Sequence, residues 1–164
     1  MSAINSDIFQ HHMSENVCFG CGMHNSEGLQ IKSRWEGELS VCDWVPLEKY
    51  HGWSNLLNGG IMATLIDCHS MCTAMADACK REGRPLDSFP EYRYATGTLN
   101  IKYLKPTSTL HPIRLEAKVV EAKGRKTRLT CDLISQNEIT ATAEVFAILV
   151  FDESKKEPQN PFKN

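Results

Sequence analysis

The sequence lacks any run of about 18 consecutive uncharged apolar residues, the length that a helix needs to cross a bilayer. Its longest apolar segment is interrupted by Asp67 and His69. Residues 1–17 are polar and have neither the basic start nor the apolar run of a secretory signal. We therefore expect a cytoplasmic protein that does not enter a membrane.

An excess of positive charge is also missing. The 18 Lys and Arg residues are balanced by 20 Asp and Glu residues, which gives a formal net charge of −2. Neutralising phosphates requires a strongly basic face, so a nucleic-acid partner is not expected. The 164 residues, of which 41% are hydrophobic and 23% charged, fit one globular domain with a substantial core.

Disulfides are not expected, although the chain has seven cysteines, because the count is odd and no secretory signal is found. Cys18 and Cys21 have the spacing of half a zinc site, but no second pair follows at a suitable distance. Cys42 and His24 would complete a ligand set only if the fold brought them close. The motif is therefore interpreted as a structural turn, and no metal is predicted. Three further cysteines recur at core spacing and are interpreted as small apolar residues, namely Cys68, Cys72 and Cys79.

Hydrophobic periodicity predicts two strands, one long helix and about four further strands. The strands are expected over residues 29–35, 39–45, 94–105, 113–119, 128–133 and 139–151, and the helix over residues 59–80, ending near Gly83. Residues 1–16 have no periodicity, and residues 153–164 are polar and contain two prolines. Both ends are predicted to be flexible, which leaves a domain over residues 17–152.

The helix predicted over residues 59–80 is apolar nearly all round, so we expect the rest of the domain to enclose it. One antiparallel sheet wrapped around this helix is the simplest α+β arrangement. Such a sheet leaves unpaired edge strands, and pairing of these edges between two copies of the chain would cover them.

Asp67 is the most informative residue of this helix. The helix opens with Gly59 and Gly60, whose backbone N–H groups face whatever approaches its first turn. Asp67 follows two turns later with no basic side chain near it in sequence, and burying an unpaired carboxylate is costly. Catalysis is one explanation; pairing with a distant Arg or with backbone groups is the other.

Three segments, in this order, carry a family resemblance: residues 18–29 (CFGCGMHNSEGL), residues 51–67 (HGWSNLLNGGIMATLID) and residues 99–106 (LNIKYLKP). They are similar to a C-x-x-C-G…N-x-x-G-L segment, a His-Gly-Gly…Leu-x-Asp block, and a strand that ends in a basic residue and proline. The chain thus resembles the hotdog-fold acyl-CoA thioesterases of the phenylacetate-pathway (PaaI-like) type.

The resemblance implies roles for five residues. Asp67 would be the nucleophile or the base that activates water, and the N–H of Gly59 or Gly60 would polarise the thioester carbonyl. Thr96 would help to hold the attacking water and would come from the other subunit, so that the active site is shared. His51 would lie near the carbonyl. A carboxylate and a helix N-terminus can supply the chemistry that thioester hydrolysis needs.

Asn58 departs from the family pattern, because it stands where the family has histidine. An amide can donate and accept hydrogen bonds but cannot transfer a proton. Hydrolysis driven by Asp67 is compatible with this change, whereas hydratase or dehydratase chemistry is disfavoured.

Coenzyme A would enter as part of the substrate, and no separate cofactor is expected. Its phosphates need basic contacts, for which Lys105, Arg125 and Lys126 are candidates, although the turn that carries Arg125 and Lys126 could also be an ordinary solvated hairpin.

The predicted function is hydrolysis of an acyl- or aryl-CoA by a homodimer or a dimer of dimers. A non-catalytic acyl-CoA binding or sensing protein on the same fold is the alternative, motivated by Asn58. A small metal-binding interaction protein built around Cys18 and Cys21 is a third.

Overall fold

A computed structural model describes residues 7–155 of the chain. Its elements, in chain order, are η1 (Phe9–His12), β1 (Arg34–Glu36), β2 (Leu39–Trp44), η2 (Glu48–Tyr50), α1 (Gly59–Arg81), β3 (Tyr92–Tyr103), β4 (Ile113–Lys123), β5 (Lys126–Ser135) and β6 (Glu138–Asp152). Across residues 7–155, none of the helices has the length and apolar character needed to span a membrane.

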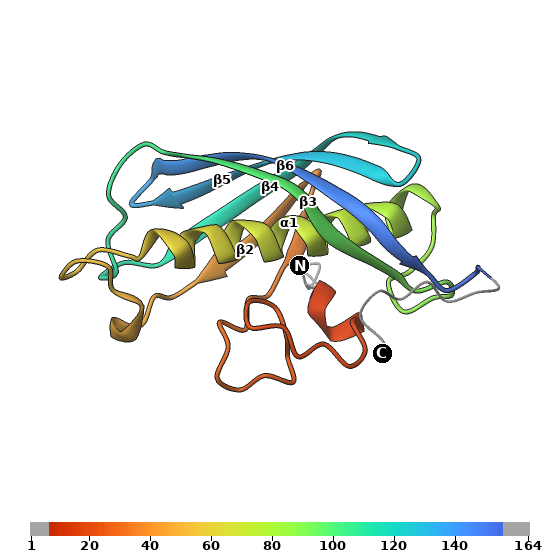
Figure 1. Cartoon of the computed structure of the whole chain (residues 1–164), viewed down its shortest axis with the longest axis horizontal. Helices are drawn as coiled ribbons and strands as arrows, with labels where there is room; N and C mark the ends of the chain where they lie inside the picture. The colour runs from red at the N-terminus through yellow and green to blue at the C-terminus, as the bar shows by residue number, and fades with distance from the viewer. Residues whose placement is uncertain (1–6, 156–164) are drawn as a thin grey trace, which may run out of the picture.

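The six strands form one antiparallel sheet in the order β1-β2-β4-β5-β6-β3. The sheet curves over α1, and the N-terminal segment lies against the side of α1 that faces away from the sheet (Figure 1). The helix is therefore covered from both sides, as its apolar sequence requires. The predicted arrangement, one antiparallel sheet around one long helix, is confirmed.

The capping residues explain where α1 begins and ends. The Asn58 side chain caps the first turn, and Gly83 ends the helix in the left-handed conformation at φ +64°. Beyond it, the Arg84 N–H donates to the Cys79 carbonyl. The helix predicted over residues 59–80 agrees with this element to within one residue.

The first predicted strand is shorter in the structure, because β1 begins only at Arg34. Leu29, Ile31 and Ser33 are buried and the residues between them are exposed, so the alternating pattern does describe the burial. The Leu29 N–H instead donates to the carbonyl of Phe19 in the preceding loop. The segment is extended, but its backbone partners belong to a loop rather than to a strand.

The flexible arm predicted over residues 1–16 is corrected for the part that the structure describes. Residues 9–12 form a short 3-10 helix, and Phe9 is completely buried beside Trp35. Gln10 donates from Nε2 to Ser33 Oγ at 3.0 Å and accepts from the Ser33 N–H at 2.8 Å. Residues 1–16 have no periodic pattern, so no local feature of the sequence predicted this docking. Residues 1–6 and 156–164 of the predicted flexible ends lie outside the described residues.

His69 extends this buried network into the core. Its Nδ1 lies 2.8 Å from Ser33 Oγ, and its Nε2 lies 3.0 Å from the Ser40 carbonyl, to which it donates in the tautomer that satisfies both contacts. Burial lowers the pKa of His69 to about 4, so the ring is neutral. His69 is therefore a buried, neutral residue that packs in the core.

Replacing Phe9 with Ala is expected to lower the free energy of unfolding by about 3–5 kcal/mol, because the truncation leaves a cavity in a packed site. Urea unfolding of the two proteins measures the difference. His11, an exposed neighbour, provides the matched control, and His11→Ala should change stability by less than about 0.5 kcal/mol. Equal small losses for both variants would mean that residues 9–12 do not form part of the core.

Candidate active site

Asp67 and Thr96 meet in one cavity. Asp67 lies on the third turn of α1, and the Thr96 hydroxyl, near the start of β3, donates a hydrogen bond to Asp67 Oδ1. Both residues line a cavity of about 570 Å³, called here the Asp67 cavity. Burial raises the pKa of Asp67 above its ordinary value, and the Thr96 hydrogen bond opposes this shift. A carboxylate of raised pKa in a cavity is a good proton acceptor.

The contact between Asp67 and Thr96 corrects the prediction that Thr96 reaches the site from the other subunit. The two side chains are joined within one chain, because β3 crosses α1 beside the turn that carries Asp67. A strand position alone could not reveal which side of the helix β3 covers.

One wall of the Asp67 cavity is apolar. Met71 and Met75 contribute to it from α1, and Tyr92 and Tyr94 from β3. The N-terminal segment closes another side with residues 12–18. Phe89, in the connection between α1 and β3, is 68% exposed and does not line this cavity.

The start of α1 is capped by Asn58. Its Oδ1 accepts from the Gly60 N–H at 2.8 Å and from the Ile61 N–H at 3.2 Å. The Gly60 N–H is thus already bonded, which corrects its prediction as an oxyanion donor. The Gly59 N–H has no hydrogen-bond partner among residues 7–155. The Asn58 side chain therefore caps the helix, and the Gly59 N–H is the free hydrogen-bond donor at its start.

Gly59 faces a second cavity, of about 600 Å³, called here the Gly59 cavity. Asn58, Tyr103 and Lys105 also line it. The Tyr103 hydroxyl donates to the Gly59 carbonyl at 2.8 Å, and the Lys105 ammonium lies 3.0 Å from the Glu138 carboxylate. Lys105 thus lies at the start of α1, and its contact with the phosphates of coenzyme A stays a prediction.

The remaining predicted site residues lie elsewhere in the chain. His51 Nε2 lies 2.9 Å from Thr109 Oγ1, and His51 lines neither cavity of the single chain, so its placement near the carbonyl stays a prediction. Arg125 Nε donates to the Leu149 carbonyl at 2.8 Å. Lys126 lies 4.1 Å above the Phe146 ring.

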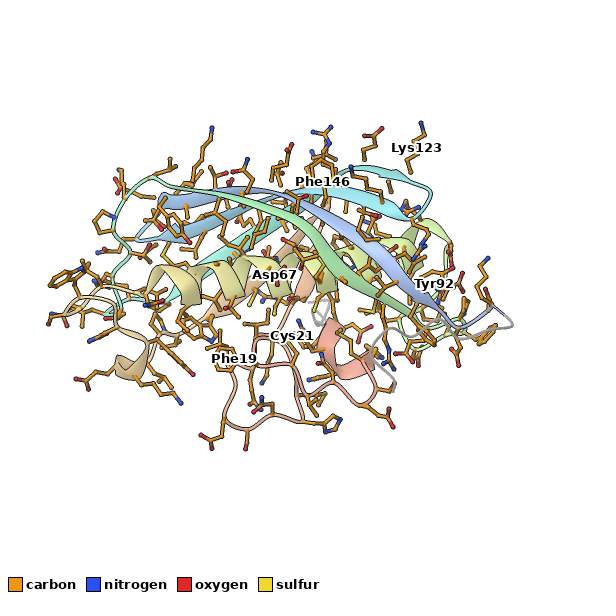
Figure 2. All side chains as sticks on the ribbon, viewed as in Figure 1. Phe19, Cys21, Asp67, Tyr92, Lys123 and Phe146 are labelled. Atoms are coloured by element: carbon orange, nitrogen blue, oxygen red, sulfur yellow. The ribbon has the colours of Figure 1, made fainter. Side chains whose placement is uncertain are left out.

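Phe146 is on the face of the sheet that points away from α1, as is Lys123 of the same basic turn (Figure 2). Arg125 and Lys126 line neither the Asp67 cavity nor the Gly59 cavity. Within one chain they are therefore not brought together with Asp67, and their contact with the phosphates of coenzyme A stays a prediction. Alternation along a strand does not tell which face meets a ligand.

One group of the site was missed in the sequence. Cys68, interpreted as a core residue, brings its thiol to those of Cys18 and Cys21, and the three Sγ atoms lie within 4.8 Å of one another. Cys42 and His24, the partners considered from spacing, are not part of this group. Cys68 directly follows Asp67 in the sequence. This proximity was the signal that could have placed Cys68 at the site.

The fold is that of the hotdog domains of the thioesterase class. Residues 54–142, just over half of the chain, match the family model of the thioesterase superfamily. The chain belongs to the thioesterase superfamily.

A curated relative is the acyl-coenzyme A thioesterase THEM4 of Rattus norvegicus. It is 24% identical over 155 residues, which make up 93% of this chain and 55% of the relative. The chain thus spans about half the length of that relative.

Solved structures agree with the fold. A thioesterase superfamily protein from Shewanella loihica PV-4 is 26% identical, with a TM-score of 0.60 over 76% of this chain and 95% of the other. The E. coli PaaI protein from the phenylacetic acid degradation operon is 11% identical, with a TM-score of 0.61 over 76% and 82%. The resemblance to PaaI-like proteins drawn from three segments is confirmed.

Proposed function

We propose that this chain hydrolyses an acyl- or aryl-CoA thioester to the free acid and coenzyme A. Membership of the thioesterase superfamily supports thioester hydrolysis in general. The observation that carries the proposal is the carboxylate of Asp67, hydrogen-bonded by Thr96, in a cavity with an apolar wall.

Asp67 acts as the base in this proposal. It accepts a proton from a water molecule whose oxygen attacks the thioester carbon, while the Thr96 hydroxyl orients the carboxylate. The Gly59 N–H donates to the carbonyl oxygen, on which negative charge develops. When the tetrahedral intermediate collapses, the C–S bond breaks and Asp67 returns the proton to the sulfur of coenzyme A. Attack by Asp67 itself, through an acyl-enzyme, is the variant of this scheme.

Asp67 and Gly59 of one chain cannot serve the same carbonyl. They are eight positions apart on α1, which is about 12 Å along the helix axis, and they face different cavities. A base and an oxyanion donor must both lie within a few ångströms of one reacting group. The site therefore combines Asp67 of one protomer with Gly59 of another.

The β3 edge offers the pairing that brings them together. β3 pairs with β6 on one side and with no other described strand on its second side. Thr96 lies beside Asp67 and Tyr103 beside Gly59, so β3 runs antiparallel to the first half of α1. Antiparallel pairing of two β3 edges about a two-fold axis near Leu99 and Asn100 brings the part of one strand that carries Thr96 alongside the part of the other strand that carries Tyr103. Asp67 of each protomer then faces the Gly59 end of α1 in the other protomer, so the dimer has two equivalent sites.

Asn58 supports hydrolysis rather than the non-catalytic alternative. Asn is among the best N-cap residues, and here its side chain bonds two of the N–H groups of the first turn. The residue that departs from the family pattern therefore fixes the helix start and leaves the Gly59 donor free. Lys105, in the Gly59 cavity, is available to the phosphates of coenzyme A.

Purified protein should release free thiol from at least one member of a CoA ester panel that runs from acetyl to palmitoyl and includes phenylacetyl. A thiol-reactive dye measures the release. Heat-denatured protein is the control for spontaneous hydrolysis. Tight binding of CoA esters by calorimetry with no thiol release across the panel would contradict hydrolysis and favour the acyl-CoA sensing alternative.

A further inference from the structure

Three thiols from two distant parts of the sequence converge beside the Asp67 cavity. Cys18 and Cys21 lie on the N-terminal loop, and Cys68 lies on α1. All three line the Asp67 cavity, and Figure 2 shows Cys21 next to the part of α1 that carries Asp67. The Sγ atoms of Cys18 and Cys68 are 3.7 Å apart.

This spacing matches a tetrahedral thiolate site. Zinc binds cysteine sulfur at about 2.3 Å, and in a tetrahedron of that size two ligand sulfurs lie about 3.8 Å apart. A disulfide would need about 2.0 Å between the two sulfurs. The observed separation excludes a disulfide and is compatible with two ligands that share an ion.

The loop around the thiols is shaped to allow this approach. A Cβ at Gly20 would lie 2.2 Å from Cys68 Sγ, so only glycine at this position lets the helix thiol reach the loop. The Gly20 N–H donates to Cys18 Sγ at 3.4 Å, and Asn16 Nδ2 lies 3.4 Å from Cys21 Sγ. Donors directed at sulfur stabilise the thiolate form, and such outer contacts orient metal ligands.

A fourth thiol is within reach. Cys72 follows Cys68 by one helical turn, which sets both on the same face of α1. Its Sγ lies 3.6 Å from Met13 Sδ, outside the group of three thiols that lie within 4.8 Å of one another, so its side chain would turn toward them to join an ion. Cys18 is exposed, so an ion can enter from solvent without opening the core.

We propose that Cys18, Cys21, Cys68 and Cys72 bind one Zn²⁺ ion, which fastens the N-terminal loop to α1 at the wall of the Asp67 cavity. Four thiolates leave no open position on the ion, so its role is structural. The Asp67 chemistry does not involve it, and the proposal stands or fails separately from the proposed hydrolysis.

Zinc stoichiometry tests this site. Metal-free protein, prepared with a chelator under reducing conditions, should take up one equivalent of Zn²⁺ and unfold at a higher temperature once loaded. Co²⁺ in its place should give the intense visible bands of tetrahedral thiolate coordination. Less than half an equivalent of tightly bound zinc, or Co²⁺ bands typical of octahedral oxygen ligands, would overturn the proposal.

Single substitutions identify the ligands. Cys18→Ser changes an exposed residue, so the fold should survive while zinc binding is lost. Cys72→Ser should weaken binding and reduce the sulfur-to-Co²⁺ charge-transfer absorption. Cys79→Ser is the matched control, since Cys79 is a buried cysteine of the same helix outside the cluster, and it should retain one equivalent. Full binding by Cys18→Ser would overturn the site, and full binding by Cys72→Ser would overturn its place as the fourth ligand.

Discussion

Replacing Asp67 with Asn should lower kcat for the best CoA ester by about 10²–10⁴-fold, the usual contribution of a general base. The amide keeps the size of the side chain and can still accept the Thr96 hydrogen bond, but it cannot take a proton from water. Steady-state thiol release by the two purified proteins measures the change.

The fold should be unaffected by this substitution. Because burial raises the pKa of Asp67, the ionised carboxylate costs stability at neutral pH, so the Asn variant should unfold at the same or a higher temperature. Asp77→Asn is the matched control, since Asp77 lies on the same helix, is paired with Arg81 at 2.7 Å and does not line the Asp67 cavity. Equal activity of Asp67→Asn and Asp77→Asn would remove Asp67 from the mechanism.

Two inactive chains should restore activity to each other if the site is shared as proposed. Gly59→Pro removes the free N–H at the first helical position, where proline is well tolerated. Asn58 at φ −60°, ψ 132° already has the extended conformation that a residue before proline adopts. The loss of one oxyanion donor should lower kcat by about 10²–10³-fold. Gly59→Ala keeps the N–H, and its Cβ would meet Tyr103 at an ordinary 3.6 Å. Comparing the two variants therefore separates the loss of the N–H donor from the effect of a larger side chain.

Co-expression with two affinity tags isolates a heterodimer of Asp67→Asn and Gly59→Pro chains. One of its two sites then has an intact Asp67 from one chain and an intact Gly59 from the other, so it should recover roughly half of the wild-type activity by site counting. A heterodimer of Asp67→Asn with Thr96→Val should gain no such site, because Asp67 and Thr96 act from the same chain. Absence of rescue in the first pair, when both parent dimers are folded, would contradict a site shared between Asp67 and Gly59.

Local sequence determined the elements and the key carboxylate. The helix was readable because apolar residues recur at its own period and because Asn58 and Gly83 mark its ends, both of which act within a few residues. The meander of β4, β5 and β6 was readable because short turns fix the pairing of adjacent strands. Asp67 stood out because a lone carboxylate in an apolar helix is costly wherever the helix packs.

Tertiary structure alone decided which groups meet. The contact of Thr96 with Asp67 depends on how β3 crosses α1, and the meeting of Cys68 with Cys18 and Cys21 depends on where a loop without periodicity is laid down. The burial of Phe9 has the same origin. Contacts between residues far apart in sequence are set by the packing of whole elements, and no local pattern encodes that packing. For this reason the sequence sufficed to predict the fold and to single out Asp67, whereas the proposed division of the site between Asp67 and Gly59 rests on the geometry.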